Sequence, residues 1–385
     1  MYNKKVVFRS ACLGMLLFGI VLITLGSVAP DLKLKLELSE ISSGTLFSIL
    51  PFGILIGSLL FGPVADKYGY RILLAISCVL LFAGFEGIAY SRSTGVIRIF
   101  IFIVGFGGGA VNGATNALVS DISEKDKGAN LSLLGVFFGI GALGMPLILG
   151  ILKDVVSFEI IVALVGALAL FVGILYLIIS FPLPKQARGL PFSKGIALVK
   201  DKVLLLLSFF LFFQSSFEAI INNWTTSYLL DQLAVPQNKA LYTLSAFVAG
   251  MAGMRLISGT FFRTVPVRRI LAFSFLLILI SLVLIKTSNS YLLATTGFVI
   301  LGAGLAGGFP IMLGFAGERF PELSGTAFSI ALFIALLGNM LINYLMGVIS
   351  QNFGIKHLIT VAFAESIIMI LLFLVIMKIL RDQRS

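Results

Sequence analysis

Three polar residues recur at a spacing of four inside one long apolar stretch, residues 203–230. They are Gln214, Glu218 and Asn222, and this spacing places them on one face of a helix. A charge at membrane depth costs roughly 2.5–3.5 kcal/mol even on lenient insertion scales, so an acid there needs a reason. Glu218 can carry a proton, it can bind hydroxyl groups without titrating, or it can be permanently paired. We favour a proton-coupling role for Glu218.

Aromatic and amide side chains follow in the same stretch. Trp224 is the only tryptophan of the chain, and Tyr228 comes four residues later, roughly a third of a turn away from the Glu218 face. Flat apolar rings suit the C–H face of a sugar, whereas amides and carboxylates suit its hydroxyls. The alternative for Trp224 is an anchor in the aromatic belt at the membrane surface. We interpret the following residues as substrate-binding: Gln214, Glu218, Asn222, Asn223, Trp224 and Tyr228.

The composition of the chain indicates that these residues lie within a membrane. The chain has 385 residues, is 59% hydrophobic and 12% charged, and has a mean hydropathy of +1.10. Apolar stretches of about twenty residues recur along its whole length, which is typical of a helical membrane protein. The first stretch is interpreted as a retained helix because no small-residue cleavage site follows it. The expected spans are 6–29, 43–65, 72–91, 96–119, 131–153, 157–181, 203–230, 239–262, 268–286, 290–316, 323–350 and 355–380.

The net charge of +11 is an orientation signal. With both termini on one side, most lysines and arginines fall in the termini and loops of that side. The positive-inside rule then predicts cytoplasmic termini in the plasma membrane and gives no reason to expect a nucleic-acid partner. Cys12 and Cys78 lie within spans and predict neither a disulfide nor a metal site.

The chain also contains an internal repeat. An ungapped shift of 197 residues aligns Gly105 with Gly302, Asp121 with Glu318, and many further glycines and loop charges. The expected organisation is therefore a six-helix half at 1–181, a basic cytoplasmic linker at 182–202 and a second half at 203–385. Parallel six-span halves around a midplane site are a common design of secondary transporters.

A charged loop between the second and third spans carries a family resemblance. It reads "GPVADKYGYR" at 62–71, with a degenerate copy at 259–269 that has Arg263 in place of the acid. This pattern resembles the signature loop of the major facilitator superfamily, and the resemblance covers the whole chain. It implies an all-α membrane protein with twelve transmembrane helices in two pseudo-symmetric six-helix halves. It also implies a conformational latch made by Gly62, Asp66, Gly69 and Arg71.

Three more stretches resemble one branch of that family, the fucose/glucose/galactose–proton symporters and related sugar porters. They are "NGATNALVSD" (112–121), "GANLSLLGVFFGIGALGMPLILG" (128–150) and "FEAIINNWTTSYLL" (217–230), the last with the Glu, Asn-Trp and Tyr-Leu of that branch. The chain departs from the fucose pattern in two places. It has no acid in the turn before Pro30, and Asn112 stands where those porters carry a glutamate. Any proton coupling must therefore use another residue.

Spans 1, 4, 7 and 10 line the cavity in the implied architecture. Asn112 and Asn116, four residues apart on the fourth span, are therefore predicted to bind substrate, and Thr24 and Ser27 to add hydroxyls. The Asn339–Asn343 pair on the eleventh span suits interhelical hydrogen bonding equally well. The glycines at 105–114 and 302–310 are interpreted as close helix contacts and not as a phosphate cradle.

The sequence gives less reason to assign a role in substrate or proton binding to the remaining ionisable groups within spans. Arg255 is a candidate partner for Glu218, since the two spans are neighbours. Glu86 is interpreted as structural or snorkelling, and Glu365 as peripheral or interhelical. His357 is the only histidine, so a metal site is not expected.

The sequence thus predicts a secondary active transporter without cofactors, not an enzyme. It would act as a monomer and move a small polar solute, with a monosaccharide as the favoured substrate, by alternating access with proton-coupled import. A drug/proton efflux pump of the same fold is the first alternative, and a membrane sugar sensor that does not transport is the second.

Overall fold

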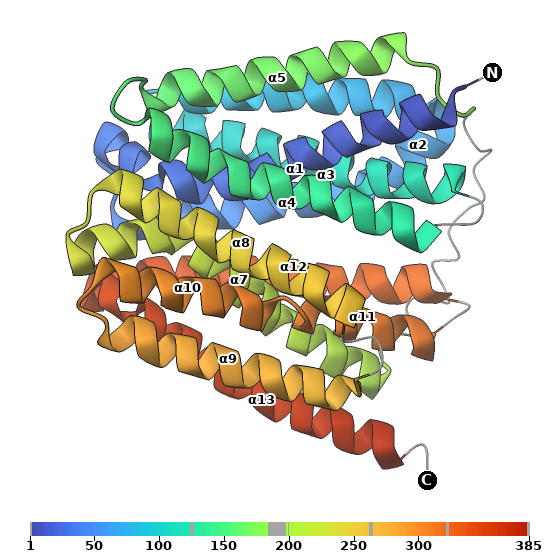
Figure 1. The fold of residues 1–385 in the computed structure, drawn as a ribbon. Helices are drawn as coiled ribbons and strands as arrows, with labels where there is room; N and C mark the ends of the chain where they lie inside the picture. Colours follow the sequence, from blue (N-terminus) through green and yellow to red (C-terminus); the bar gives the residue numbers. More distant parts are fainter. Residues whose placement is uncertain are drawn as a thin grey trace. The chain divides into compact units, whose positions relative to one another are not determined.

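The computed structural model describes residues 2–123, 127–183, 198, 200–261, 265–320 and 323–382. Within these residues, twelve helices are long and apolar enough to cross a membrane, so the predicted fold class is confirmed. The elements, shown in Figure 1, are α1 (Lys4–Leu36), α2 (Glu40–Tyr90), α3 (Thr94–Ile122), α4 (Lys127–Leu152), α5 (Phe158–Ile178), α7 (Lys202–Leu233), α8 (Gln237–Phe261), α9 (Val267–Thr287), α10 (Tyr291–Leu305), α11 (Gly308–Arg319), α12 (Ser324–Phe353), η2 (Ile355–His357) and α13 (Leu358–Asp382).

Helices and spans do not correspond one to one. α2 contains two spans, Glu40–Gly62 and Lys67–Tyr90, and the helix is kinked at Gly69, near the start of the second, where a φ of 81° favours glycine. The tenth span is interrupted instead, because α10 ends at Leu305 and α11 begins at Gly308. This interruption lies inside a span and was not predicted from the sequence.

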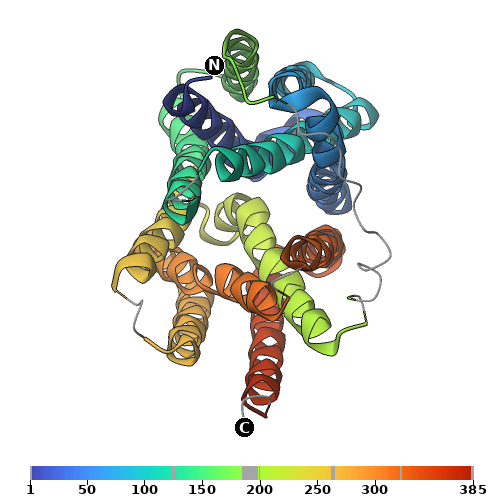
Figure 2. The same ribbon diagram turned by 90° about the vertical axis from the view of Figure 1, so that its right-hand side faces the viewer.

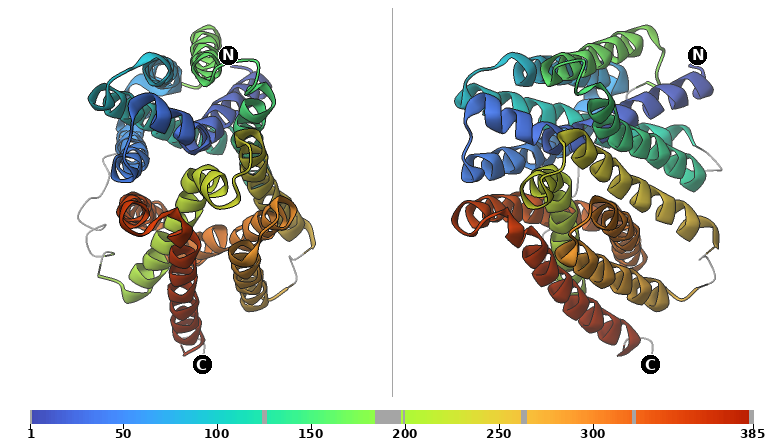
Figure 3. Two further views of the ribbon diagram at one scale, coloured as in Figure 1. Left: turned by 90° about the vertical axis from the view of Figure 1, so that its left-hand side faces the viewer. Right: turned by 60° about the vertical axis from the view of Figure 1, so that its left-hand side comes forward.

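The chain divides into two compact units. Unit 1 comprises Met1–Arg188 with Gln237–Ser245, and unit 2 comprises Gly189–Pro236 with Ala246–Ser385. In unit 1, α2 packs against α3 and α5, while α1 packs against α4 and α3 (Figure 2). In unit 2, α7 packs against α12, α13 and α11, and α9 packs against α10. Figure 3 shows α13 in red and α7 in yellow-green.

The first turns of α8 depart from the halves expected from the sequence. The sequence predicts a second half at 203–385, whereas Gln237–Ser245 belong to unit 1 in the structure. Tyr242 donates a hydrogen bond to the carbonyl of Gly150 at 3.1 Å, and the Gln237 amide donates to Asp31 at 2.6 Å. Side-chain contacts with α4 and α1 therefore hold the start of this helix.

Glycines set the closest helix approaches in unit 1. A Cβ placed on Gly53 would lie 2.4 Å from the carbonyl oxygen of Phe102, and one on Gly105 would lie 2.3 Å from that of Leu50. Both distances are far inside van der Waals contact, so α2 and α3 approach backbone to backbone. Small residues at such crossings are typical of membrane helices, where packing drives association.

Unit 2 repeats this contact at the shift of 197 residues. A Cβ on Gly250 would lie 2.2 Å from the carbonyl oxygen of Val299, and one on Gly302 would lie 2.1 Å from that of Phe247. All four positions are the equivalents of those in unit 1. The internal repeat therefore extends from residue types to the helix crossing that the glycines permit.

α4 offers a matched test of this packing. A Cβ on Gly141 would lie 2.1 Å from the Leu16 carbonyl oxygen, whereas one on Gly144 would meet no atom within 4 Å. Gly141→Ala is expected to destabilise the protein by about 1–3 kcal/mol through overpacking. Gly144→Ala is expected to be neutral or to stabilise by about 0.5–1 kcal/mol, since alanine is the better helix former. Thermal unfolding in detergent compares the two, and equal effects would contradict the close α1–α4 crossing.

Candidate functional site

The seventh span, α7, carries the candidate polar face, and Gln214 is its first member. This side chain is 1% exposed, and its amide nitrogen donates to the carbonyl oxygen of Leu305 at 3.0 Å. Leu305 is the last residue of α10, where carbonyls lack partners within the helix. Gln214 was predicted to bind substrate, but the structure uses its amide to support the break in the tenth span.

Arg255 of α8 contacts the same break. Its Nε donates to the carbonyl oxygen of Ala306 at 3.4 Å, and the side chain is exposed. Gly308 begins α11 here, and a Cβ at that position would lie 2.5 Å from the Gln214 amide oxygen. The break thus has side-chain donors from two other helices and needs a glycine beside Gln214. The run "GAGLAGGFP" at 302–310 was the available signal, although it had been interpreted only as helix contacts.

Glu218 lies one helical turn beyond Gln214 and is half-buried. No hydrogen bond or ion pair joins its carboxylate to another described residue, although Arg255 acts on it electrostatically. The suggested Glu218–Arg255 ion pair is therefore not formed in this structure, since the arginine Nε donates to Ala306 instead. A nearby positive charge reduces the cost of an ionised acid, and the free oxygens of Glu218 can accept a proton or a hydroxyl.

Asn222 completes the face and is also half-buried. Its side-chain oxygen is buried and has no hydrogen-bond partner in the described structure. An orphaned buried acceptor costs about 1–3 kcal/mol, so it favours a donor from outside the chain. Glu218 and Asn222 therefore form a pair of unused acceptors on one helix face, which is the arrangement that a ligand with hydroxyl donors requires.

The neighbouring Asn223 and Trp224 serve a different purpose. The Asn223 amide and the Trp224 indole nitrogen both donate to the side-chain oxygen of Asn343, at 3.1 and 3.3 Å. Asn343 in turn donates to the backbone and side-chain oxygens of Asn339, at 2.8 and 3.0 Å. Of the two interpretations left open for the Asn339–Asn343 pair, the structure shows the interhelical one.

This network involves two of the residues that were predicted to bind substrate. Trp224 is 1% exposed and Asn223 is 6% exposed, so neither presents an open surface to substrate, and Trp224 is not an exposed belt anchor either. Tyr228 is also buried, at 6% exposure. Sequence spacing identified a polar helix, but it did not reveal which of its faces packs against α12.

The fourth-span pair lies on α3 in unit 1. Asn116 donates through its amide to the backbone and side-chain oxygens of Asn112, at 2.9 and 3.0 Å, and both residues are half-buried. The two amides are thus brought together as expected from their spacing. The Asn116 amide nitrogen also contacts the Met15 sulfur at 3.9 Å, so among the described residues the groups left for a ligand are the Asn116 side-chain oxygen and the Asn112 amide nitrogen.

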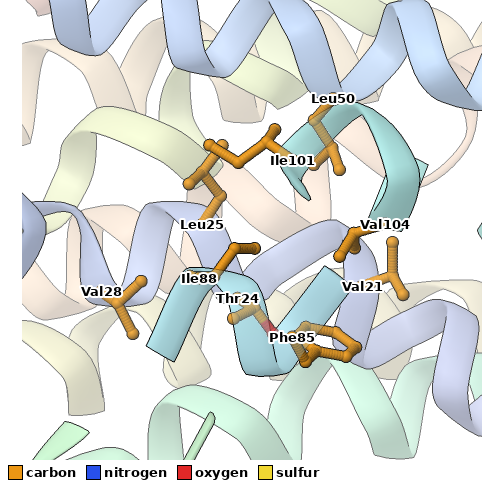
Figure 4. A pocket seen from close by; sticks show the side chains of 9 residues that line it. All are labelled: Val21, Thr24, Leu25, Val28, Leu50, Phe85, Ile88, Ile101 and Val104. Carbon is orange, nitrogen blue, oxygen red and sulfur yellow. The ribbon is translucent and has the colours of Figure 1, made fainter. Parts of the chain in front are cut away.

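The first-span hydroxyls are less open than predicted. Thr24 donates to the Ile20 carbonyl at 2.6 Å, and Ser27 to the Ile23 carbonyl at 2.8 Å, and both residues are fully buried. Thr24 borders a small cavity in unit 1 whose other lining residues are apolar (Figure 4). This cavity offers no set of polar groups for a sugar.

The predicted latch residues lie around the turn between the second and third spans. Arg71 donates to the carbonyl of Leu177, at the C-terminal end of α5, and Tyr70 donates to Asp121 at 2.8 Å. Gly69 supplies the left-handed turn, while Gly62 has no close neighbour that would exclude a side chain. The Asp66 side chain and Arg263 lie outside the described residues.

Glu86 and Glu365 differ in their surroundings. Glu86 is half-buried near the end of its span, whereas Glu365 is 3% exposed and its Oε1 lies at hydrogen-bond distance from the Ser216 hydroxyl of α7. For Glu365, left open as peripheral or interhelical, the structure shows the interhelical position. Sequence analysis missed its partner, because a serine two residues before Glu218 carries no distinguishing signal.

Comparison with known proteins identifies the class. The family model of the Major Facilitator Superfamily matches residues 11–331. The glucose/mannose transporter GlcP of Bacillus subtilis is 24% identical over 86% of this chain and 84% of its own length. The sodium-dependent glucose transporter 1 of Xenopus laevis is 23% identical over 94% of this chain and 79% of its own. A multi-drug resistance efflux pump PmrA homolog of Lactococcus lactis is 26% identical over 47% of this chain and 48% of its own.

Solved structures agree on the fold. The nucleoside transporter NupG superposes with a TM-score of 0.82 at 18% identity, covering 97% of this chain and 99% of that one. The D-xylose-proton symporter superposes with a TM-score of 0.78 at 16% identity, covering 96% of both chains. The protein is a multi-pass membrane transporter of small molecules and not an enzyme. It belongs to the major facilitator superfamily.

The asparagine network predicts a specific loss of stability. Asn343→Leu removes the acceptor of Asn223 and Trp224 and leaves two buried donors unpaired, so we expect a loss of about 1–2 kcal/mol. Asn352→Leu, on the exposed side of the same helix, is the matched control and should change stability by no more than about 0.5 kcal/mol. Thermal unfolding in detergent measures both. An Asn343→Leu protein as stable as the control would show that the network contributes nothing.

Proposed function

We propose that this transporter imports a monosaccharide together with a proton, and that Glu218 is the coupling residue. The observation that carries the proposal is the free carboxylate of Glu218, half-buried inside a membrane span with no hydrogen bond or ion pair to a described residue. Ionisable residues at such depth mark substrate or proton pathways as a default hypothesis. Its neighbours Gln214, Asn223 and Trp224 are engaged between helices, so they do not share this role.

The proposed substrate class follows from the unused acceptors. The Asn222 oxygen and the Glu218 carboxylate both lack hydrogen-bond partners among the described residues, and sugar hydroxyls are donors. The half-buried amides of Asn112 and Asn116 on α3 are the proposed second group of contacts. Relatives named as glucose/mannose and glucose transporters support a hexose as the first substrate to test.

Arg255 has a defined part in the proposed cycle. With Glu218 ionised, the arginine charge stabilises it, and with Glu218 protonated the arginine keeps its bond to the Ala306 carbonyl. Proton binding therefore changes the charge balance next to the break between α10 and α11. Broken helices near the midplane are common substrate and ion sites in secondary transporters. Alternating access would expose this region to each side in turn.

The proposed setting is the plasma membrane, with both termini cytoplasmic and a single chain as the working unit. The excess of lysine and arginine in the termini, the 62–71 loop and the 182–202 linker supports this orientation. The hydrogen bond from Arg71 to the end of α5 supports a latch at the same surface.

Drug efflux is the second candidate, because an efflux pump homologue aligns with about half of the chain. An efflux pump needs a large apolar cavity for amphipathic compounds, whereas the free groups on α7 are polar. The two functions differ in the direction of the exchange. A sugar importer moves proton and substrate together, and an efflux pump moves them in opposite directions.

The test is uptake of radiolabelled D-glucose into proteoliposomes, with the lumen about one pH unit above the outside. One pH unit is worth about 1.4 kcal/mol, so coupling to one proton sustains about tenfold accumulation at most. Wild type is expected to accumulate glucose, while Glu218→Gln is expected only to equilibrate it, because the amide cannot release a proton.

Glu86→Gln is the matched control, since it also removes a half-buried acid from a span, and it should accumulate glucose like wild type. Accumulation of glucose by the Glu218→Gln variant would show that Glu218 is not the coupling residue. If wild type moved no glucose but expelled a cationic dye in exchange for protons, efflux would replace sugar import as the function.

A further inference from the structure

A second acid is buried beside α7, on the helix face away from the candidate site. Glu365 of α13 is 3% exposed, and its Oε1 contacts the hydroxyl of Ser216 at hydrogen-bond distance. Its Oε2 is buried without any hydrogen-bond partner in the described structure. Two residues along a helix correspond to about 200° of rotation, so Ser216 and Glu218 point to nearly opposite faces. α7 therefore lies between two acids.

The single hydroxyl proton of Ser216 limits which charge states Glu365 can have. The Ser216 hydroxyl also lies 3.1 Å from the carbonyl oxygen of Phe213, in the geometry of a bond back into its own helix. A serine has one proton to donate, so it cannot donate to both Phe213 and Glu365 at once. If the proton goes to Phe213, the contact with Glu365 requires a proton on the acid. If Glu365 is ionised, Ser216 must turn its proton away from Phe213.

In the part of the chain that the structure describes, no cation forms an ion pair with Glu365. Its Oε1 lies at hydrogen-bond distance from the Ser216 hydroxyl, and its Oε2 has no hydrogen-bond partner among the described residues. The elements packed against α13 are α7, α9, α12 and η2, and the described part of α12 has no charged side chain. The titratable and charged groups on the others are Lys202, Glu218, Tyr228 and Asp231 of α7, Arg268, Arg269 and Lys286 of α9, and Lys356 and His357 of η2.

The contact made by Lys286 of α9 supports the same conclusion. The Lys286 Nζ lies 6.0 Å from the centre of the Phe363 ring. Phe363 precedes Glu365 by two residues, so Lys286 contacts this ring and not the acid. An unpaired carboxylate with an unsatisfied oxygen in such an interior costs several kcal/mol, whereas the protonated acid is neutral and can donate to Ser216. The surroundings of Glu365 thus suit the acid with its proton.

We propose that Glu365 is a proton-binding site of this transporter, separate from Glu218, and that its proton sets the direction of the Ser216 hydrogen bond between α13 and α7. With the proton bound, Glu365 donates to Ser216, and Ser216 donates to Phe213. When the proton leaves, Ser216 reverses and donates to Glu365, so the bond from Ser216 to its own helix is lost. This inference goes beyond the proposed function, because it requires neither a sugar substrate nor coupling through Glu218.

Infrared spectroscopy of the full-length protein in lipid nanodiscs tests the site directly. The C=O stretch of a protonated carboxylic acid is separate from that of a carboxylate. Wild type at neutral pH is expected to show the protonated band, and Glu365→Gln is expected to lose it. Glu86→Gln, the matched substitution of another intramembrane acid, and Glu218→Gln should both retain the part of the band that Glu365→Gln removes. Because no transport is measured, failure of the sugar hypothesis does not affect this result.

Ser216→Ala provides a second and independent readout. It leaves Glu365 in place but removes its partner, so the protonated band is expected to shift to higher wavenumber while remaining present. This variant carries the test if Glu365→Gln does not fold. A wild-type spectrum without the protonated band at neutral pH would overturn the proposal. So would a band that neither Glu365→Gln nor Ser216→Ala alters.

Discussion

The interior of a bilayer has no water to satisfy an exposed backbone N–H or C=O, and this constraint governs the whole structure. It explains why the chain is built from helices long enough to cross, and why the interrupted tenth span needs hydrogen-bond donors from other helices. The break between α10 and α11 leaves the carbonyls of Leu305 and Ala306 without partners in their helix. Gln214 and Arg255 supply the missing donors from α7 and α8. The cost of interrupting a span is thus met by polar side chains that would otherwise be unexpected in a membrane.

The same constraint separates the polar residues of α7 into two groups. One group is consumed by helix contacts: Gln214 at the break, Ser216 against Glu365, and Asn223 with Trp224 against α12. The other group, Glu218 and Asn222, retains acceptors that have no hydrogen-bond partner in the described structure. A transporter requires this second group, because a group already satisfied by the protein has little to gain from a substrate.

Hydropathy and an internal shift were enough to predict twelve spans and two repeated halves, because both depend on local residue types. The repeat even extends to the contacts of Gly53 and Gly250, since a backbone approach permits only glycine. Side-chain roles were harder to predict. The four-residue spacing predicted that Gln214, Glu218 and Asn222 share one helix face, but it did not indicate that Gln214 reaches a broken helix.

The tertiary contacts of the other α7 residues carry no signal in sequence. Trp224 suited either a sugar pocket or a membrane belt, and only the rotation of α7 against α12 shows that it is buried against Asn343. Ser216 and Glu365 are 149 residues apart, and nothing local links them. Helix rotation and partner choice are decided by packing across the unit, which a periodic pattern along one helix does not contain.

The central claim is that sugar and proton cross together, and sugar-driven proton movement tests it most directly. Proteoliposomes with equal pH on both sides would hold a trapped pH-sensitive dye, and D-glucose would be added outside. The account predicts that the lumen acidifies as glucose enters, and that a proton ionophore abolishes the change. Glucose entry with a constant lumen pH would contradict proton coupling, and a lumen that becomes alkaline would indicate exchange in opposite directions.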